Sequence, residues 1–343
     1  TEGSPFLDEG IWNCLTCSLC TERCPSNVRY VDFMLACREE AGLLGRTKSC
    51  AHKNILLDLQ RIMANPKIDQ NRLKWLPKGA KHSQSGDVLY FVGCLPYFDV
   101  IFRDIKAKTL ETARSVVRIL NRADIEPVLL ENERCCGHDL HFTGDKMNFE
   151  KLARMNVSAI RKTNVRKVIT SCAECYRTLK LDYPKVVGEL GFEVLHISEF
   201  LADLIENEEI ELPSAFKEKK VTYHDPCRLG RHMGLYDQPR TVIDSILDTD
   251  LLEMERNREN ALCCGVNSWL NCGKLSKQIQ LDRLKEAKAT GADWLITSCP
   301  KCQIHLKCAT DGELPIKRSE VNLKIYDLPV LFAKALHQEK SKG

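Results

Sequence analysis

The sequence has few of the features that direct a protein to a membrane or to nucleic acid. Its charges nearly cancel, leaving a formal net charge of +3, which is too small to indicate binding to nucleic acid or to an anionic membrane surface. No run of apolar residues reaches the ~18 needed to span a bilayer. Residues 88–102 come nearest, but Gly93, Pro96 and Asp99 interrupt them. We therefore predict a protein without a membrane span that does not bind nucleic acid.

Targeting and nucleotide-binding signals are missing as well. The first ten residues lack the charged-then-apolar pattern of a secretory signal. We therefore expect a cytoplasmic protein, which a partner subunit could hold at the periphery of the membrane. There is neither a G-x-G-x-x-G fingerprint nor a phosphate loop, so a flavin or nicotinamide is expected on a partner. Thiols stay reduced in the cytoplasm, and the 18 cysteines therefore indicate metal ligation or redox chemistry.

Ten of the 18 cysteines form two sets of five with the same order: a lone cysteine, an adjacent pair followed by glycine (CCG), and a C-x-x-C motif. Ile-Thr-Ser precedes both C-x-x-C motifs, and the step from CCG to C-x-x-C is 36 positions in one set and 35 in the other. This regularity indicates a duplication. The first set is Cys94, Cys135, Cys136, Cys172 and Cys175; the second set is Cys227, Cys263, Cys264, Cys299 and Cys302.

The hydrophobic pattern divides the chain into three units. Residues 1–87 carry apolar residues at helical spacing in 30–44 and 53–63, followed by a polar linker at 65–87. The first repeat, 88–218, has apolar runs typical of strands at 88–92, 127–130, 167–170 and 192–197. The second, 219–343, has them at 221–223, 251–254, 294–297 and 323–326. Helical patterns separate the runs, which predicts parallel sheets covered by helices.

The lone cysteines and the C-x-x-C motifs come directly after predicted strands. Ligands gather at the carboxyl ends of the strands in such sheets, so we expect each set of five thiolates to collect at one sheet edge. Zinc takes four ligands, and each set offers five. An adjacent pair reaches two different irons more easily than one tetrahedral ion. The sets therefore favour an iron–sulfur cluster of unusual shape with one bridging sulfur, and the alternative is structural zinc in one or both sets.

The run at 14–25 has the ligand pattern of bacterial ferredoxins, C-x-x-C-x-x-C-x-x-x-C-P. It predicts a cubane [4Fe-4S] cluster, because a zinc site would use paired C-x-x-C motifs. In two-cluster ferredoxins the fourth cysteine of such a run serves the other cluster. Two interpretations therefore remain open here: Cys24 closes its own cluster, or Cys37 or Cys50 supplies the fourth ligand. The predicted cubane ligands are Cys14, Cys17, Cys20 and Cys24.

The remaining cysteines and four histidines have weaker signals. We interpret Cys272 and Cys308 as packing residues. The histidines lie beside predicted ligands, where they could carry protons near pH 7, although a hydrogen-bonded structural role is the more common one. They are His138, His141, His224 and His232.

Two copies of C…CCG…C-x-x-C resemble the cysteine-rich domains of heterodisulfide reductase subunits HdrB and HdrD. The stretch from His224 to Gly265 is closely similar to HdrD-type proteins, and the front run WNCLTCSLCTERCPSNV resembles the second cluster motif of HdrC, which is fused in HdrD. The resemblance implies a noncubane [4Fe-4S] cluster in each set and cleavage of a disulfide between the two clusters. There are two departures: this chain has one cubane motif where those subunits usually carry two, and 266–273 replaces a glycine-rich run.

These observations predict an α/β protein in which two pseudo-symmetric, small Rossmann-like CCG domains with parallel sheets follow a mostly α-helical ferredoxin-like domain. The resemblance implies the catalytic subunit of an iron–sulfur oxidoreductase complex, in which all ten repeat cysteines hold the clusters that act on the disulfide and a cubane supplies electrons. The expected partners are a flavin-containing HdrA-like or other donor subunit and a further iron–sulfur or membrane cytochrome subunit. The alternative is an electron-transfer subunit, without a substrate of its own, that links a flavoprotein to a quinone.

Overall fold

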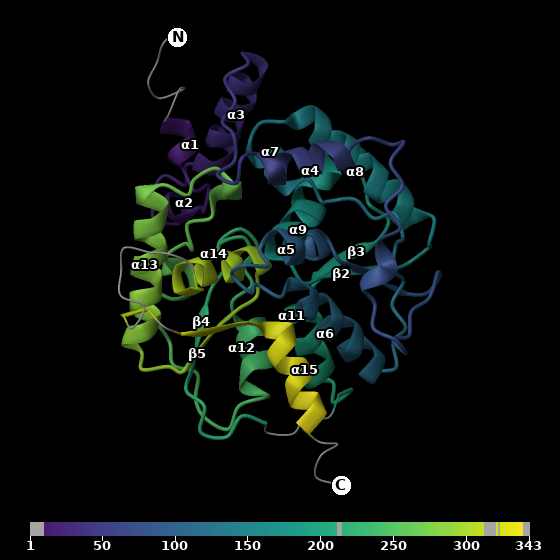
Figure 1. Ribbon diagram of the computed structural model, residues 1–343, viewed down its shortest axis with the longest axis vertical. Helices are drawn as coiled ribbons and strands as arrows, with labels where there is room; N and C mark the ends of the chain where they lie inside the picture. The colour runs from purple at the N-terminus through teal and green to yellow at the C-terminus, as the bar shows by residue number, and fades with distance from the viewer. Residues whose placement is uncertain (1–9, 211–214, 312–319, 322, 339–343) are drawn as a thin grey trace.

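The structure is a computed structural model that describes residues 10–210, 215–311, 320, 321 and 323–338. Its N-terminal part is helical, as predicted. In α4, Leu56, Leu57 and Met63 are buried on one face while the charged Asp58 faces outward. The two short helices α1 and α2 lie beside the long α3 (Figure 1). The elements are α1 (Ile11–Asn13), α2 (Leu19–Glu22), α3 (Tyr30–Leu43), α4 (Ile55–Met63) and the 3-10 helix η2 (Arg72–Trp75).

The first repeat contains a three-stranded parallel sheet in the order β1-β2-β3. Its strands are β1 (Val88–Phe91), β2 (Lys167–Thr170) and β3 (Glu193–His196). Its helices are α5 (Leu95–Ile101), α6 (Thr109–Arg122), α7 (His138–Phe142), α8 (Lys146–Arg161), α9 (Ala173–Arg177), the π-helix η3 (Thr178–Asp182), α10 (Tyr183–Val187) and α11 (Ile197–Glu206).

The second repeat has the same topology, with a parallel sheet in the order β4-β5-β6. Its strands are β4 (Val221–His224), β5 (Trp294–Thr297) and β6 (Lys324–Asp327). Its helices are α12 (Asp237–Asp244), the 3-10 helices η4 (Arg258–Asn260) and η5 (Asn267–Trp269), α13 (Lys274–Ala289), α14 (Pro300–Asp311) and α15 (Leu328–Gln338). The predicted α/β fold with two pseudo-symmetric parallel sheets is confirmed. The domain limits at 87/88 and 218/219 stay a prediction.

Two of the predicted strands are wrong. Residues 127–130 make only isolated bridges through Val128, which pairs with Ser83 and Leu89, and 251–254 forms no strand, although Leu252 N–H donates to Val221 O. For residues 127–130, the reason for the missing strand lies beside β1. The Glu133 carboxylate accepts hydrogen bonds from the backbone N–H groups of Val92 and Gly93. A side chain therefore satisfies the end of β1 where a longer edge strand would have done so.

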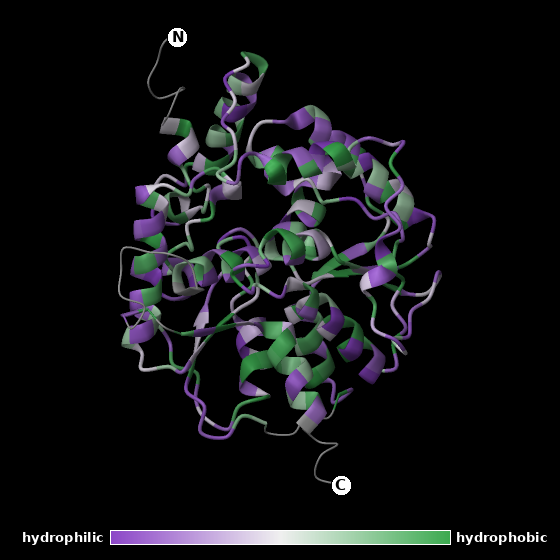
Figure 2. Cartoon of the chain, viewed as in Figure 1, coloured by the Kyte–Doolittle hydropathy of each residue, from purple (hydrophilic) through white to green (hydrophobic). Residues whose placement is uncertain are grey.

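Helices from the two repeats pack on each other and join the halves. Helix α6 lies against α15, and α11 against α12. Their apolar faces form one continuous core with the inner faces of both sheets, containing for example Val117, Leu120, Val242, Leu331 and Phe332. Figure 2 shows this helical layer as largely hydrophobic between the sheets and polar at its outer surface. The opposite faces of the strands, such as Leu89 and Phe91 of β1, belong to a second core that contains the cysteines. Both sheets are therefore buried on both faces, as is usual for parallel sheets.

Candidate metal centre

The first cysteine set gathers where β1 and β2 end. Cys94 lies between β1 and α5, Cys172 between β2 and α9, and the Cys135–Cys136 pair directly before Gly137 and α7. The Sγ atoms of Cys175 and Cys136 are 3.3 Å apart, and Cys94 contacts Cys135. Hydrogen bonds from Cys136 and Cys94 hold the pKa of Cys135 well below its usual range. The structure therefore brings these five predicted ligands together.

The second set is assembled in the same way. Cys227 follows β4 closely, Cys299 lies between β5 and α14, and Cys302 is in the first turn of α14. The Sγ atoms of Cys263 and Cys227 are 4.0 Å apart, and the Cys264 thiol contacts those of Cys263 and Cys302.

Both CCG motifs require a glycine at their third position, for conformational and steric reasons. Gly137 has φ of 79° and Gly265 has φ of 94°, a region that L side chains rarely adopt. A Cβ added at Gly137 would lie 3.0 Å from Phe149, and one at Gly265 would lie 3.1 Å from the Ser276 carbonyl. These glycines let the chain turn sharply after the adjacent cysteines and pack closely against α8 and α13.

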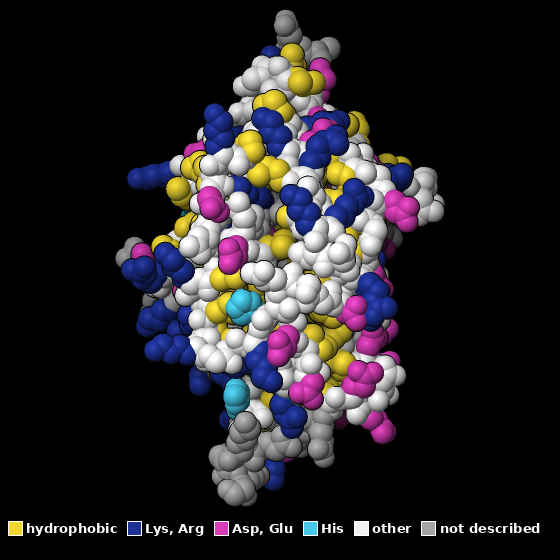
Figure 3. Space-filling view, turned by 90° about the vertical axis from the view of Figure 1, so that its right-hand side faces the viewer, with side chains coloured by type: hydrophobic (Ala, Val, Ile, Leu, Met, Phe, Trp, Pro, Cys, Tyr) yellow, Lys and Arg dark blue, Asp and Glu magenta, His cyan; other side chains and the backbone are white. Residues whose placement is uncertain are grey.

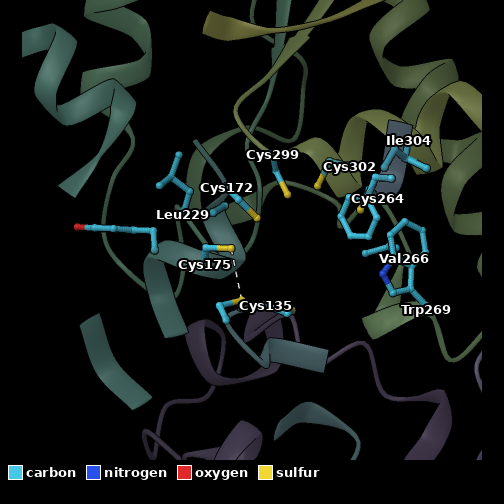
Figure 4. Packing of buried hydrophobic residues seen from close by; sticks show 14 of the residues in the cluster. Cys135, Cys172, Cys175, Leu229, Cys264, Val266, Trp269, Cys299, Cys302 and Ile304 are labelled. Carbon is cyan, nitrogen blue, oxygen red and sulfur yellow. Dashed lines mark hydrogen bonds between the residues drawn. The ribbon is translucent and has the colours of Figure 1, made fainter. Parts of the chain in front are cut away.

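The two sets meet at their C-x-x-C motifs. The Cys172 thiol of the first set contacts the Cys299 thiol of the second, and Figure 4 shows the side chains of Cys172 and Cys299 pointing toward each other. Eight of the ten cysteines are buried; Cys94 and Cys227 are partly exposed. All 18 cysteines of the chain are free of disulfide bonds. A concentrated set of soft, buried thiols fits iron–sulfur clusters better than hard metal ions.

The N-terminal cysteine run reaches the second set. Cys17 contacts Cys263, and mainly through this hydrogen bond the pKa of Cys17 falls to about 5. Cys14 lies close enough to Cys17 and Cys20 for their charges to affect its pKa, which burial raises. Three arginine side chains hold the backbone of this loop: Arg38 donates to Cys14 O, Arg228 to Thr16 O, and Arg231 to Cys17 O.

The three candidates for the fourth cubane ligand lie in different surroundings. The described contacts of Cys24 are with the backbone N–H groups of residues 26–28, which lower its pKa, beginning with Val28. Cys37 packs in the same small apolar cluster as Cys14, whereas Cys50 is buried in the large core among α4 residues. Which cysteine serves as the fourth ligand stays a prediction.

The two remaining cysteines differ. Cys272 is exposed, so its interpretation as a packing residue is wrong. Cys308 is half-buried and its Sγ accepts from Lys277 Nζ at 3.3 Å.

Residues 266–273, which depart from the family pattern, serve as a docking surface for the N-terminal part. The side-chain amides of Asn267 and Asn271 both donate to Trp12 O at 2.7 Å. The backbone N–H of Ala51 donates to Trp269 O, and the Trp269 ring stacks on Phe102 with centroids 5.0 Å apart.

A buried ion cluster lies where the two sets meet, and sequence reasoning missed it. Lys301, inside the second C-x-x-C motif, binds Asp139 and also Glu174, which is inside the first. His138 Nδ1 lies 3.1 Å from both carboxylates. Burial raises the pKa of Glu174 to about 8. Burial also acts to raise the pKa of Asp139, but Lys301 and His138 together outweigh it and hold that pKa below its usual range. The signal was present in the sequence: the variable pairs Ala-Glu and Pro-Lys of the two motifs have opposite charge.

The predicted proton-carrying histidines are held by arginines. Arg228 Nε donates to His138, and Arg177 Nε to His232. Burial lowers the pKa of His138 to about 3 and that of His232 well below its usual value. These contacts favour the structural interpretation of both side chains. His141 stacks on Phe149.

The described residues contain two groups whose ligand atoms lie within 4.8 Å of one another: His224 with Cys264 and Cys302, and His138 with Asp139 and Glu174. The first group has the donor types of a zinc site. In the part of the chain that the structure describes, no helix has the length and apolar character needed to cross a membrane.

Comparison with known proteins agrees with this architecture. The cysteine-rich domain family called CCG matches residues 88–180 and 221–307. The HdrD subunit of the dihydromethanophenazine:CoB–CoM heterodisulfide reductase from Methanosarcina mazei is 36% identical over 99% of this chain and 81% of its own length. EtfAB:quinone oxidoreductase of Syntrophomonas wolfei is 27% identical over 96% of this chain and 47% of its own. A hypothetical protein from Helicobacter pylori shares the fold, with a TM-score of 0.53 at 14% identity over 92% of this chain and 60% of its own.

The duplicated sheets, the two matching CCG domains and the extent of the similarity lead to one conclusion. This chain is an iron–sulfur oxidoreductase subunit, and it belongs to the CCG-domain family that includes the HdrD-type heterodisulfide reductase subunits.

Proposed function

We propose that the chain is the catalytic subunit of a heterodisulfide-reductase-like complex. Each set of five cysteines would hold a noncubane [4Fe-4S] cluster, and Cys14, Cys17 and Cys20 with a fourth cysteine would hold a cubane. Bound there, the clusters would supply one-electron redox chemistry and open iron sites for thiolates. Cysteine thiolates are the usual ligands of such clusters.

The contact between Cys172 and Cys299 is the observation that carries this proposal. It brings the two sets to one point, so that the two sulfurs of a disulfide could each face one set. The reaction R–S–S–R′ + 2e⁻ + 2H⁺ → R–SH + R′–SH needs two electrons, and two equivalent sites can each handle one. The contact between Cys17 and Cys263 gives a third site next to the second set, through which single electrons could enter.

The protein itself would hold the site together. The Lys301–Asp139–Glu174 cluster joins the two C-x-x-C motifs across the halves, and Arg228 and Arg231 fix the N-terminal loop against the second set. A flavin-containing donor subunit would supply the electrons, because this sequence carries no nucleotide fingerprint. A further iron–sulfur or membrane cytochrome subunit is the second proposed partner.

The test uses protein purified without oxygen, with reduced viologen dye as electron donor and the CoB–CoM heterodisulfide as substrate. We expect dye oxidation that depends on the disulfide and releases two thiols for every two electrons. A protein that contains its iron but oxidises the dye no faster with the disulfide, or with other small disulfides, would refute the proposed activity.

A second candidate is an electron-transfer subunit between a flavoprotein and a quinone. Two observations favour it: the similarity to EtfAB:quinone oxidoreductase and the burial of eight of the ten cysteines, because a relay needs no access for a substrate. The same preparation distinguishes the two, since a relay would pass electrons to a quinone analogue and leave the disulfide intact. Structural zinc in one set is the remaining alternative, and metal analysis detects it.

A further inference from the structure

The two halves differ at the last residue of their first strand. Strands β1 and β4 pair with β2 and β5 in the same register, and this places Phe91 opposite Thr170 and His224 opposite Thr297. One residue earlier the halves are alike, because Tyr90 and Tyr223 both hydrogen-bond a serine that precedes the C-x-x-C motif. The first set therefore faces a phenyl ring at the position where the second faces an imidazole.

Arg283 determines which nitrogen of His224 carries the proton. Both side chains are fully buried, and Arg283 Nε lies 2.9 Å from His224 Nδ1. Two more donors of the same guanidinium are directed elsewhere, to Arg256 O at 2.7 Å and Glu286 Oε2 at 2.8 Å. A guanidinium can only donate. His224 Nδ1 must therefore accept, and the ring proton is on Nε2.

The protonated nitrogen faces the second cysteine set. A ring nitrogen of His224 and the Sγ atoms of Cys264 and Cys302 lie within 4.8 Å of one another in the fully buried interior. Since Nδ1 is occupied by Arg283, Nε2 is the nitrogen available to the sulfur, and this buried atom has no hydrogen-bond partner recorded among the described residues.

This arrangement is incompatible with His224 as a metal ligand. Ligation through Nε2 needs a lone pair there, and a neutral imidazole would then carry its proton on Nδ1. That proton would point at the Nε–H group of Arg283, so that two donors would face each other. The group formed by His224, Cys264 and Cys302 is consequently not a histidine-containing zinc site.

We propose that His224 donates a hydrogen bond from Nε2 to the Cys264 thiolate and thereby makes the cluster of the second set easier to reduce than that of the first. Hydrogen bonds to ligand sulfurs disperse negative charge and are one of the main controls on iron–sulfur reduction potentials. Because Phe91 cannot donate, the duplicated sites become unequal, and the second set, next to Cys17, accepts an electron first. This inference rests on the proposed clusters.

Two variants of similar polarity separate the possible roles of His224. In His224→Asn the shorter amide stays at the position of Nδ1, where it can accept from Arg283 but falls short of Cys264. In His224→Gln the longer amide places an N–H group at about the position of Nε2. Anaerobically purified wild-type and variant proteins are titrated with reductant and followed by electron paramagnetic resonance. The signal of the second cluster is identified as the one that Cys264→Ser removes.

We expect the ratio of reduced to oxidised second cluster in His224→Asn to fall roughly tenfold at a given potential, the effect of losing one hydrogen bond to a charged group. That corresponds to about 59 mV for a one-electron couple. His224→Gln should stay close to wild type, and the first cluster should be unchanged in both.

An unchanged second cluster in His224→Asn would overturn the inference, as would an equal fall in both variants or loss of iron from both. If the Asn variant alone fails to hold the second cluster, the Gln variant decides: a wild-type potential supports the donor role, and a lowered one refutes it. Absence of a cluster from the second set of the wild-type protein would refute the proposed function and this inference with it. A cluster that does not respond to His224 refutes this inference alone.

Discussion

At the scale of single residues, the most informative feature is a lysine placed between two carboxylates in the interior. Lys301, Asp139 and Glu174 are at most 4% exposed. Removing one partner from a buried ionic group leaves uncompensated charge, which commonly costs about 3–5 kcal/mol. Lys301 therefore stabilises the contact between the halves. Its positive charge also compensates the two acidic side chains that lie beside a thiolate-rich site.

We expect Lys301→Met to lower the urea midpoint of unfolding by an amount equivalent to about 3–5 kcal/mol. The matched control is Arg166→Met, which removes a salt bridge to Asp87 in which both side chains are well exposed, and which should leave the midpoint unchanged because solvent screens such pairs. Equal midpoints for Lys301→Met and wild type would show that the cluster contributes nothing to stability.

The adjacent cysteines provide a second test at this scale. Cys136→Ser and Cys264→Ser each replace a soft thiolate by a hydroxyl, which iron–sulfur clusters bind poorly. Either change should abolish disulfide reduction while the N-terminal cubane still accepts electrons from a chemical reductant. Full activity in the Cys136 variant, with loss in the Cys264 variant only, would make the first half structural or a relay and would exclude cleavage between two clusters.

The fourth cubane ligand is tested by Cys24→Ala, with Cys37→Ala as its counterpart. If Cys24 closes the cluster, its variant should lose or convert the cubane signal while both clusters of the repeats remain. An unchanged signal in Cys24→Ala together with a changed one in Cys37→Ala would identify Cys37, which packs near Cys14.

At the scale of elements, close backbone contact joins the N-terminal helices to the first repeat. Gly144, between α7 and α8, has φ of 81°, and a Cβ built there would lie 2.2 Å from the carbonyl oxygen of Arg38 in α3. The Arg38 guanidinium, fully buried, also donates to Phe142 O at 2.7 Å. Only glycine permits the two backbones to approach this closely.

Gly144→Ala should therefore weaken the docking of α3, at a cost of about 1–3 kcal/mol for overpacking in addition to the strain of its backbone conformation. The control is Gly188→Ala, which has a similar φ of 76° but no atom within 4 Å of the added Cβ. Urea unfolding and limited proteolysis of the N-terminal helices measure the effect. An equal loss of stability in both variants would show that the effect comes from the backbone conformation alone and not from the contact with α3.

The elements also show why sequence prediction succeeded in some places and failed in others. The runs at 88–92, 167–170 and 294–297 were correctly predicted as strands, because adjacent apolar residues within each run are buried on both faces of the sheet. The run at 127–130 is also mostly apolar, but beyond Val128 its pairing is replaced by the Glu133 carboxylate at the end of β1. A side-chain cap of this kind depends on a neighbour distant in sequence, and no local pattern indicates it.

At the scale of the whole molecule, the charged surface is separate from the cysteine sets. The face in Figure 3 carries side chains of both signs interspersed, whereas the cysteine sets lie in the interior core. The three predicted clusters would bring about twelve irons to each chain, at four per cluster. Metal analysis of anaerobically prepared protein checks this number. About four irons with two zincs would contradict the double-cluster proposal and leave the cubane in place.

The order of the cysteines predicted that each set would gather at its sheet edge, since the repeats could be aligned on the motif alone. The spacing alone could not predict that the two sets meet, which only the family resemblance implied. The contacts of Cys172 with Cys299 and of Cys17 with Cys263 join residues more than a hundred positions apart. They depend on how the halves pack, and the charged pair formed by Glu174 and Lys301 was overlooked for the same reason.

The helical layer between the halves has a mechanical consequence. Because α6 packs on α15 and α11 on α12 within one continuous apolar core, the halves cannot swing apart without exposing that core to water. The spacing of the two cysteine sets is therefore fixed when the chain folds. If a disulfide binds where the two sets meet, selection among disulfides would therefore depend on their size and reach, with no closing movement of the protein.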